Sequence, residues 1–313
     1  MERYRIIDCH CDTLCELIKQ GKELQEGDVC VSLPKMKANT SYLQFFALFV
    51  HDNEETPFRR ANDLMAVYKR QLQLFQSDLV PVLNSRDAET VISGKKTGAM
   101  LTLENGRSLE GNIQNLYYFY EHGARAMGLT WNGANELCDG IGIPNGRGLT
   151  DFGREVVSAM NQLGMLVDVS HISEKGFWDV LEESSQPVMA THSNSRSVCR
   201  HKRNLTDKQI HALALQGGVI GLNLFPEFLS DGKTAGWEDC AHHIRHIISV
   251  GGEDCIGLGS DFDGFPEPMP VGINGAEDYG FLFDKLKENG LSAQQIEKIT
   301  YKNVLNLIKT ILK

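Results

Sequence analysis

The sequence predicts an α/β fold, namely one (β/α)8 TIM-like barrel domain that spans residues 1–313. Two observations lead to this prediction. Short apolar runs alternate with amphipathic stretches along the whole chain, and eight such runs fit into 313 residues. No repeat, low-complexity segment or Pro/Ser-rich linker divides the chain, which favours a single domain. A doubly wound open sheet is the alternative, since it also alternates strands and helices.

Each of the eight candidate strands is a continuous apolar run. Such runs are typical of parallel strands that are buried on both faces, whereas half-exposed strands alternate apolar and polar residues. A sheet of this kind needs helices to cover it, and helical patterns lie between most of the runs. The candidate strands cover residues 4–10, 42–50, 98–104, 125–130, 165–170, 187–192, 217–223 and 255–260.

Helix start signals and long loops occur between these strands. Thr206 and Ser292 each stand three residues before a Gln, which is the pattern of a capping box at a helix N-terminus. The Gly- and Pro-containing stretches 139–149 and 264–275 each follow a candidate strand. We therefore expect them to be long loops on the side of the barrel where active sites are built.

Composition and charge exclude several classes of function. The 31 Lys and Arg residues against 41 Asp and Glu give a formal net charge of −10 without any basic run, so nucleic acid is not an expected partner. No apolar stretch is long enough to span a membrane and no signal-peptide pattern occurs, so we expect a cytoplasmic protein without membrane attachment. The eight cysteines follow no disulfide framework, which predicts reduced and mostly buried thiols.

The first candidate strand ends in a run of residues that can all bind a metal, Asp-Cys-His-Cys-Asp. Because side chains alternate along a strand, Asp8, His10 and Asp12 share one face. Cys9 and Cys11 lie on the opposite face, toward the helical layer. An imidazole and a carboxylate that converge at the barrel mouth suit zinc or a similar divalent ion. A Cys-His-Cys site fails because adjacent strand residues cannot all reach one ion, and a buried polar network without metal is the remaining alternative.

Further candidate strands also end in His, Asp or Glu, at the rim where catalytic residues of barrels collect. These residues are more than one zinc ion requires. A pair of ions with a shared carboxylate would use them, and two ions can activate a bridging water and polarise a carbonyl, which is hydrolase chemistry. By strand alternation either Asp261 or Asp263, which follow the last candidate strand, could face the barrel mouth, and Asp261 is favoured because it lies nearer the strand. The residues are Glu104, His171, His192, Asp261 and Asp263.

Other patterns carry less weight. His242 and His246 have a metal-compatible i, i+4 spacing, but they fall opposite the apolar stripe of their helix, so we expect them at the surface. The chain has no G-x-S-x-G elbow, P-loop or Rossmann fingerprint. A thiol nucleophile is disfavoured because Cys9 and Cys11 point away from His10.

Six short motifs together resemble one known family. In chain order they are Asp-x-His-x-Asp (8–12), Leu-Glu-Asn-Gly (103–106), Val-Ser-His (169–171), Thr-His-Ser (191–193), Arg-Asn (203–204) and Gly-Ser-Asp-Phe-Asp-Gly (259–264). They resemble the membrane dipeptidase family, also called renal dipeptidase or peptidase family M19. The similarity runs from about residue 5 to the C-terminus.

The resemblance implies a distorted barrel of the amidohydrolase type with two zinc ions. On this chain, His10 and Asp12 would bind one zinc ion. Glu104 would bridge both ions, and His171 and His192 would bind the second. The implied reaction is the hydrolysis of short dipeptides by a metal-bridged hydroxide, with a D-residue tolerated at the C-terminal position. The resemblance also leads us to expect a homodimer.

Substrate contacts are implied as well. Arg203 would hold the C-terminal carboxylate of the substrate by a bidentate pair, and Asp261 would carry a proton from the bridging water to the leaving amine. Animal members carry a His where this chain has Trp131, so the indole N–H or the neighbouring Asn132 would have to polarise the scissile carbonyl. This difference keeps a second hypothesis open, a metal hydrolase for another amide, a lactone or a deaminase substrate. A barrel that binds without catalysis is disfavoured by the intact ligand set.

Overall fold

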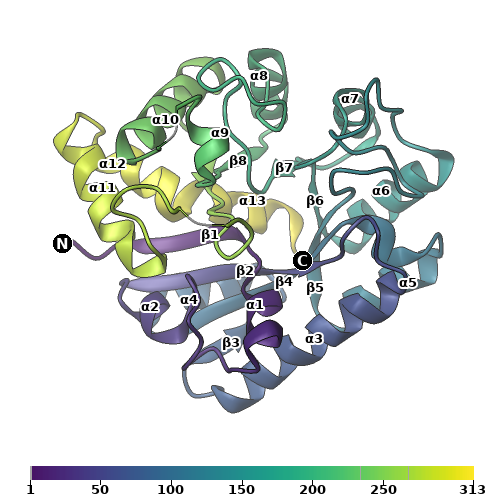
Figure 1. The fold of residues 1–313 in the computed structure, drawn as a ribbon, viewed down its shortest axis with the longest axis horizontal. Coiled ribbons are helices and arrows are strands. Elements are labelled where there is room, and N and C mark those ends of the chain that lie inside the picture. The colour runs from purple at the N-terminus through teal and green to yellow at the C-terminus, as the bar shows by residue number, and fades with distance from the viewer. Residues whose placement is uncertain (1, 233, 267) are drawn as a thin grey trace.

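The computed structural model describes residues 2–232, 234–266 and 268–313, and it shows a closed barrel of parallel strands surrounded by helices (Figure 1). The barrel strands pair in the order β2-β1-β9-β8-β7-β6-β5-β4, and the pairing of β2 with β4 closes the ring. The predicted (β/α)8 barrel is therefore confirmed, and the open sheet is excluded. The strands are β1 (Arg5–Cys11), β2 (Ser41–Phe49), β4 (Thr97–Glu104), β5 (Ala124–Gly128), β6 (Leu166–Asp168), β7 (Met189–Ala190), β8 (Val219–Leu222) and β9 (Ile256–Leu258).

One further strand, β3 (Leu79–Pro81), was not predicted. It pairs with the first residues of β4, and β5 pairs with the later residues of the same strand edge. The ring of eight strands is therefore not interrupted. Its three residues are too few for a recognisable apolar run, and Pro81 has no backbone N–H to donate to a neighbouring strand.

Strands β6 and β7 end earlier than the apolar runs predicted. The reason is the side chain of Asp168, which accepts hydrogen bonds from the backbone N–H of Ser170 at 2.8 Å and of Thr191 at 2.9 Å. A carboxylate thus replaces backbone carbonyls as the acceptor beyond the end of β6. The chain leaves the sheet just before the predicted ligands His171 and His192.

Helices cover the barrel, and the two predicted capping boxes are present at Thr206 and Ser292. In both, the hydroxyl accepts from a backbone N–H while the Gln side chain accepts from the backbone N–H of the cap residue. The helices are α1 (Thr13–Gln20), α2 (Leu33–Lys37), α3 (Pro57–Leu74), α4 (Ser85–Ser93), η1 (Gly106–Leu109), α5 (Ile113–Glu121), α6 (Asp151–Leu163), α7 (Glu174–Glu183), α8 (Asp207–Leu215), α9 (Pro226–Leu229), α10 (Trp237–Gly251), η2 (Ala276–Asp278), α11 (Tyr279–Glu288), α12 (Ala293–Glu297), η3 (Lys298–Lys302) and α13 (Asn303–Ile311).

The two predicted loops follow β5 and β9. Within the described residues, 139–149 and 264–275 hold only isolated β-bridges. The first loop packs tightly on the segment after β5, because a Cβ atom on Gly140 would lie 2.1 Å from the carbonyl oxygen of Trp131. A glycine is therefore required at this close approach. The same loop donates a backbone N–H to the carbonyl of Asn132 at 2.8 Å, which fixes that segment at the barrel rim.

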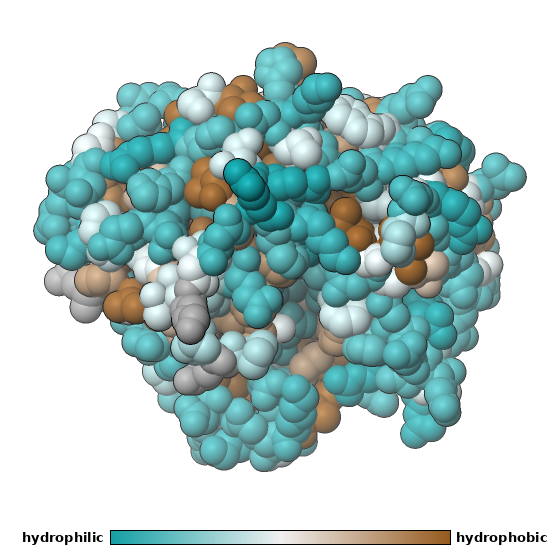
Figure 2. All heavy atoms as spheres, turned by 45° about the horizontal axis from the view of Figure 1, so that its top comes forward, coloured by the Kyte–Doolittle hydropathy of each residue, from teal (hydrophilic) through white to brown (hydrophobic). Residues whose placement is uncertain are grey.

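The surface is largely hydrophilic on the face that Figure 2 shows, with apolar residues in small groups only. All eight cysteines are free and seven are buried, as predicted. Among the described residues, none of the helices combines the length and the apolarity that crossing a membrane would require. The large apolar side chains that remain exposed are Leu74, Ile143, Trp178, Leu215 and Val271.

Candidate metal centre

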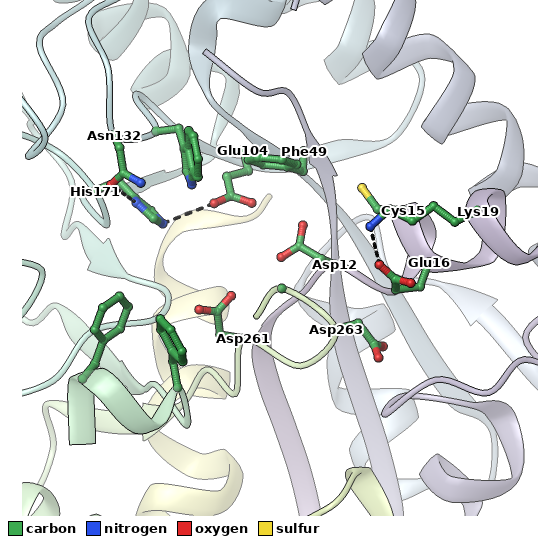
Figure 3. A pocket seen from close by; sticks show the side chains of 14 residues that line it. Asp12, Cys15, Glu16, Lys19, Phe49, Glu104, Asn132, His171, Asp261 and Asp263 are labelled. Atoms are coloured by element: carbon green, nitrogen blue, oxygen red, sulfur yellow. Dashed lines mark hydrogen bonds and ion pairs between the residues drawn. The ribbon is translucent and has the colours of Figure 1, made fainter. Parts of the chain in front are cut away.

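The centre of the rim is occupied by Glu104, the last residue of β4, whose two oxygens face different partners. Oε2 lies 3.3 Å from Nε2 of His10. Oε1 lies 3.3 Å from Nε2 of His171 and 3.9 Å from Nε2 of His192. Figure 3 shows Glu104 and His171 pointing toward each other across the pocket. Residues far apart in the sequence thus meet on the two sides of one carboxylate.

A second group of donors lies on the His10 side of this carboxylate. Nε2 of His10 is 3.3 Å from Oδ2 of Asp12 and 3.7 Å from Oδ1 of Asp261. The three side chains come from β1, the residue after it and the segment after β9. In Figure 3, Asp12 and Asp261 lie on the same side of the pocket, below Glu104.

The sequence left open whether Asp261 or Asp263 faces the centre, and strand alternation cannot decide between them. Strand β9 ends at Leu258, and the two residues have φ angles of 63° and 65°, so the alternation of a strand does not apply. The carboxylate of Asp263 instead accepts hydrogen bonds from Oγ1 of Thr13 at 2.5 Å and from the backbone N–H of Cys30 at 2.8 Å. It ties three segments together, whereas Asp261 faces His10.

Several buried donor atoms in the centre lack a protein partner, and this fits a cation. Oδ1 of Asp12 is buried without a hydrogen bond, and Oε2 of Glu104 has only the 3.3 Å contact to His10 without hydrogen-bond geometry, which is costly for buried carboxylate oxygens. Nδ1 of His171 lies 3.1 Å from Oδ1 of Asn132, and its Nε2 lies 2.8 Å from Nε2 of His192, on the side of Glu104. Buried imidazole nitrogens and carboxylate oxygens suit zinc or another divalent metal. Two overlapping groups have ligand atoms within 4.8 Å of one another, namely His10, Glu104 and His192, and His10, Asp12 and Asp261.

Burial and neighbouring charges shift the pKa values of these groups in different directions. Burial raises the pKa of Glu104 to about 7 and the pKa of Asp261 to about 6. Burial alone would lower the pKa of His10, but nearby carboxylates, Glu104 first among them, outweigh it and hold this pKa well above its usual value. Burial and nearby positive charges push the pKa values of His171 and His192 well below the usual range. The two sides of Glu104 therefore differ in charge as well as in ligand type.

Arg203 lies beside the centre and is only 5% exposed. Its guanidinium donates to Oγ of Ser193 at 3.1 Å and to the carbonyl of His192 at 3.0 Å, while its Nε has no partner. The guanidinium lies 5.6 Å from the centre of the Phe228 ring. Burial lowers the pKa of Arg203 to about 10, and the carboxylate of Asp261 opposes this shift.

Trp131 and Asn132 follow β5 and line the same pocket as the ligand candidates Asp12, Glu104 and His171. The ring of Trp131 lies 5.2 Å from the ring of Phe49, 4.9 Å from that of His51 and 6.2 Å from that of His171. Trp131 therefore belongs to an aromatic wall of the pocket, next to the predicted ligand His171.

The pocket has a volume of about 210 Å³ and includes side chains that sequence reasoning missed. Phe49 is the last residue of β2, and Phe225 and Phe228 follow β8, so all three lie at the rim with the predicted residues. For Phe49 and Phe225, the position at or soon after a strand end was an available signal. Glu16 and Lys19 of α1 also line the pocket and form an ion pair at 2.6 Å, and no motif pointed to them.

The remaining predicted histidines lie away from the centre. His242 is exposed and His246 forms an ion pair with Asp207 at 2.8 Å, so both lie at the surface as expected. His243 between them is fully buried, where it accepts from the backbone N–H of Ser195 and faces the carbonyl of Leu229.

Comparison with known proteins agrees with this arrangement. An uncharacterized dipeptidase of Schizosaccharomyces pombe is 32% identical over an alignment of 336 positions that covers 97% of this chain and 80% of that protein. The structure of dipeptidase AC, a metallo-peptidase of family M19, is 26% identical, with a TM-score of 0.93 over 99% of both chains. A metallo-peptidase of Rhodobacter sphaeroides, solved with a phosphinate mimic of the dipeptide L-Ala-D-Ala, is 25% identical, with a TM-score of 0.91 over 99% of this chain and 100% of its own.

The family model for membrane dipeptidase (peptidase family M19) matches residues 1–313. This match covers every residue that the centre is built from. The chain therefore belongs to the membrane dipeptidase family, peptidase family M19, whose members are metal-dependent dipeptidases.

Proposed function

We propose that this protein is a dipeptidase that uses two zinc ions to hydrolyse short dipeptides with free termini. The observation that carries the proposal is the position of Glu104. One of its oxygens faces His10 and the other faces His171 and His192, at 3.3 to 3.9 Å. A carboxylate with nitrogen ligands on both sides is suited to bridge two ions.

The ligands divide into two sets around this bridge. His10 and Asp12 would hold one ion, and His171 and His192 would hold the other. Oδ1 of Asp12 and Oε2 of Glu104, which lack a hydrogen bond, both lie on the His10 side and support a cation in the first set. When bound, the two ions would activate a water molecule and polarise the scissile carbonyl.

Asp261 is the residue that we expect to hold and move a proton. Its Oδ2 accepts a hydrogen bond from Asn223 at 3.0 Å, which fixes the carboxylate and leaves Oδ1 on the His10 side of the pocket. From this position Oδ1 would take a proton from the attacking water and deliver it to the leaving amine. Asp263 is not available for this role because its oxygens already bind Thr13 and Cys30.

Three further side chains would select the substrate: Trp131 and Asn132 line the pocket, and Arg203 lines an adjoining cavity that also contacts His171. Arg203 would bind the C-terminal carboxylate, and its partnerless Nε supports this role. Trp131 and Asn132 line the pocket beside His171, where the scissile carbonyl would lie. A C-terminal D-residue is part of the proposal, since the related Rhodobacter sphaeroides peptidase was solved with a mimic of L-Ala-D-Ala.

A dipeptide panel would test the proposal. Zinc-loaded protein would be assayed on dipeptides with an L- or D-residue at the C-terminal position, with chelator-treated protein as the metal control. We expect cleavage that depends on metal and that Asp261→Asn abolishes. The matched control is His242→Ala, since His242 is an exposed histidine outside the centre and its loss should leave the rate unchanged.

The panel also separates the alternatives. Absence of cleavage with two zinc ions bound would contradict the dipeptidase proposal. It would favour another amide or a lactone as substrate, with Trp131 as the first residue to change. Absence of bound metal would contradict the metal centre itself.

A further inference from the structure

A buried carboxylate outside the ligand set lies directly beneath His192. Asp168, the last residue of β6, is 3% exposed and accepts three hydrogen bonds. Two come from the backbone N–H groups of Ser170 and Thr191, at 2.8 and 2.9 Å. The third comes from the hydroxyl of Thr191 at 2.5 Å. Asp168 itself makes no contact with the metal position.

The hydroxyl of Thr191 connects this carboxylate to the ligand ring. Oγ1 of Thr191 lies 2.8 Å from Nδ1 of His192. A hydroxyl has one proton, and Thr191 gives it to the Asp168 carboxylate, which can only accept. Its oxygen must therefore accept from Nδ1–H of His192. This assignment leaves Nε2 of His192 without a proton, so in the metal-free protein it accepts from Nε2–H of His171 at 2.8 Å.

We propose that Asp168 and Thr191 are positioning residues that fix His192 in its Nδ1-protonated tautomer, with Nε2 free to bind a metal. The proposal rests on the proposed function for its metal, but the tautomer is a property of the protein alone. Histidines that bind metals usually donate their other ring N–H to an oxygen, which fixes the ring and strengthens the ligand. In this protein the oxygen is the buried hydroxyl of Thr191. Because this hydroxyl donates its proton to the carboxylate of Asp168, it can only accept a hydrogen bond from His192.

A second buried carboxylate provides a matched control. Asp8 of β1 is also fully buried, and it accepts from the backbone N–H and the hydroxyl of Ser260 at 2.9 and 2.6 Å and from the hydroxyl of Tyr279 at 2.7 Å. It also accepts from the backbone N–H of His10 at 3.3 Å, but it reaches no ring nitrogen of a predicted ligand. Loss of Asp8 therefore reports the general cost of removing a buried carboxylate at this rim.

The test is ¹⁵N NMR of the imidazole nitrogens in the full chain, before and after metal removal, with the His192 signals assigned by their loss in His192→Gln. We expect wild-type His192 to carry its proton on Nδ1 in both states. Thr191→Val should shift His192 to a mixture of tautomers in the metal-free protein, and Thr191→Ser should restore the wild-type signals. Asp8→Asn should leave them unchanged.

Metal affinity provides the second measurement, by competition with a chelator. In Thr191→Val, one of the two zinc ions should bind about 10- to 100-fold more weakly, the usual effect of losing such a partner. Thr191→Ser should keep the affinity. A wild-type His192 that carries its proton on Nε2 would overturn the proposal, and this result does not require any variant to fold. A Thr191→Val protein in which the His192 tautomer and the zinc affinity are unchanged would overturn it as well. If the wild type bound no zinc, the proposed function would fail, and the tautomer would decide this inference alone.

Discussion

The two sides of the candidate centre differ in their chemistry. The oxygen-rich half (His10, Asp12 and Asp261) comes from β1 and β9, and nearby carboxylates hold the pKa of its histidine well above the usual value. The nitrogen-rich half (His171 and His192) follows β6 and β7, and burial keeps the pKa values of both rings well below the usual range. The first half therefore holds excess negative charge that a cation can neutralise, whereas the second presents neutral rings.

The same difference extends to the hydrogen bonds behind the ligands. In the nitrogen-rich half, each Nδ1 atom faces an oxygen, from Asn132 for His171 and from Thr191 for His192. In the oxygen-rich half, Oδ1 of Asp12 has no partner. We infer that the two ions would be bound differently. Neutral imidazoles already oriented by hydrogen bonds would bind the ion of the nitrogen-rich half, and negatively charged carboxylates would bind the ion of the oxygen-rich half. Four predictions test this difference, from the largest expected effect to the smallest.

Glu104→Gln should have the largest effect because Glu104 belongs to both halves. We expect kcat/KM to fall at least about 1000-fold, since metal assistance is worth several kcal/mol and each 1.36 kcal/mol is a factor of ten. Both zinc ions should bind more weakly than in the wild type, as measured by elemental analysis after dialysis. A variant that keeps both ions and its rate would show that Glu104 does not bridge the halves.

His171→Ala should separate the halves. One zinc ion should be lost with most of the activity, while the ion of the oxygen-rich half remains, because its ligands are untouched. Zinc content and dipeptide hydrolysis measure both effects. The exposed His242 serves as the control histidine, and a His171→Ala protein that retained two ions would contradict the assignment.

Asp261→Asn should stabilise the metal-free protein in a pH-dependent way. The pKa of Asp261 is raised to about 6 in the folded state by burial, above its usual value. The folded state therefore binds this proton more tightly, and ionisation costs stability as the pH rises from about 4 to about 6. Above pH 6, Asp261→Asn should be more stable than the wild type by about 3 kcal/mol. Urea unfolding of the two metal-free proteins at pH 4 and pH 7 measures this. If the free energy of unfolding of Asp261→Asn differed from that of the wild type by the same amount at pH 4 and pH 7, the raised pKa of Asp261 would be contradicted.

Arg203→Ala should have the smallest of the four effects. We expect KM to rise about 10- to 100-fold for dipeptides with a free C-terminal carboxylate, the value of a charge-assisted hydrogen bond. C-terminally amidated substrates should show little change. Arg203→Lys keeps the positive charge but loses the two parallel donors of the guanidinium, so its KM should lie between those of the wild type and Arg203→Ala. An equal rise in KM for amidated substrates would mean that Arg203 acts on the fold alone.

Much of the fold could be predicted from the sequence, because continuous apolar runs and capping boxes are local patterns. The barrel, its eight main strands, the two long loops and the caps at Thr206 and Ser292 follow from them. The cluster of His10, Glu104 and His192 could also be anticipated, since residues at the ends of parallel strands meet at one rim.

The rest depends on tertiary structure that no local pattern encodes. His171, Asp261 and Asp263 have φ angles between 63° and 65°, so their directions do not follow from strand alternation. Asp168 ends β6 early because its side chain binds backbone groups of another segment, Thr191 among them. Of the aromatic residues that line the pocket, the sequence singled out Trp131, whereas Phe49, Phe225 and Phe228 carry no local pattern that separates them from core residues.

The most direct test of two unlike metal positions is a zinc titration of metal-free wild-type protein, followed by competition with a chelator. The account predicts two zinc ions per chain with different affinities. It also predicts that the affinity of one ion rises with pH through the range in which Asp261 ionises. A single bound ion, or two ions with equal affinities and equal pH dependence, would contradict it.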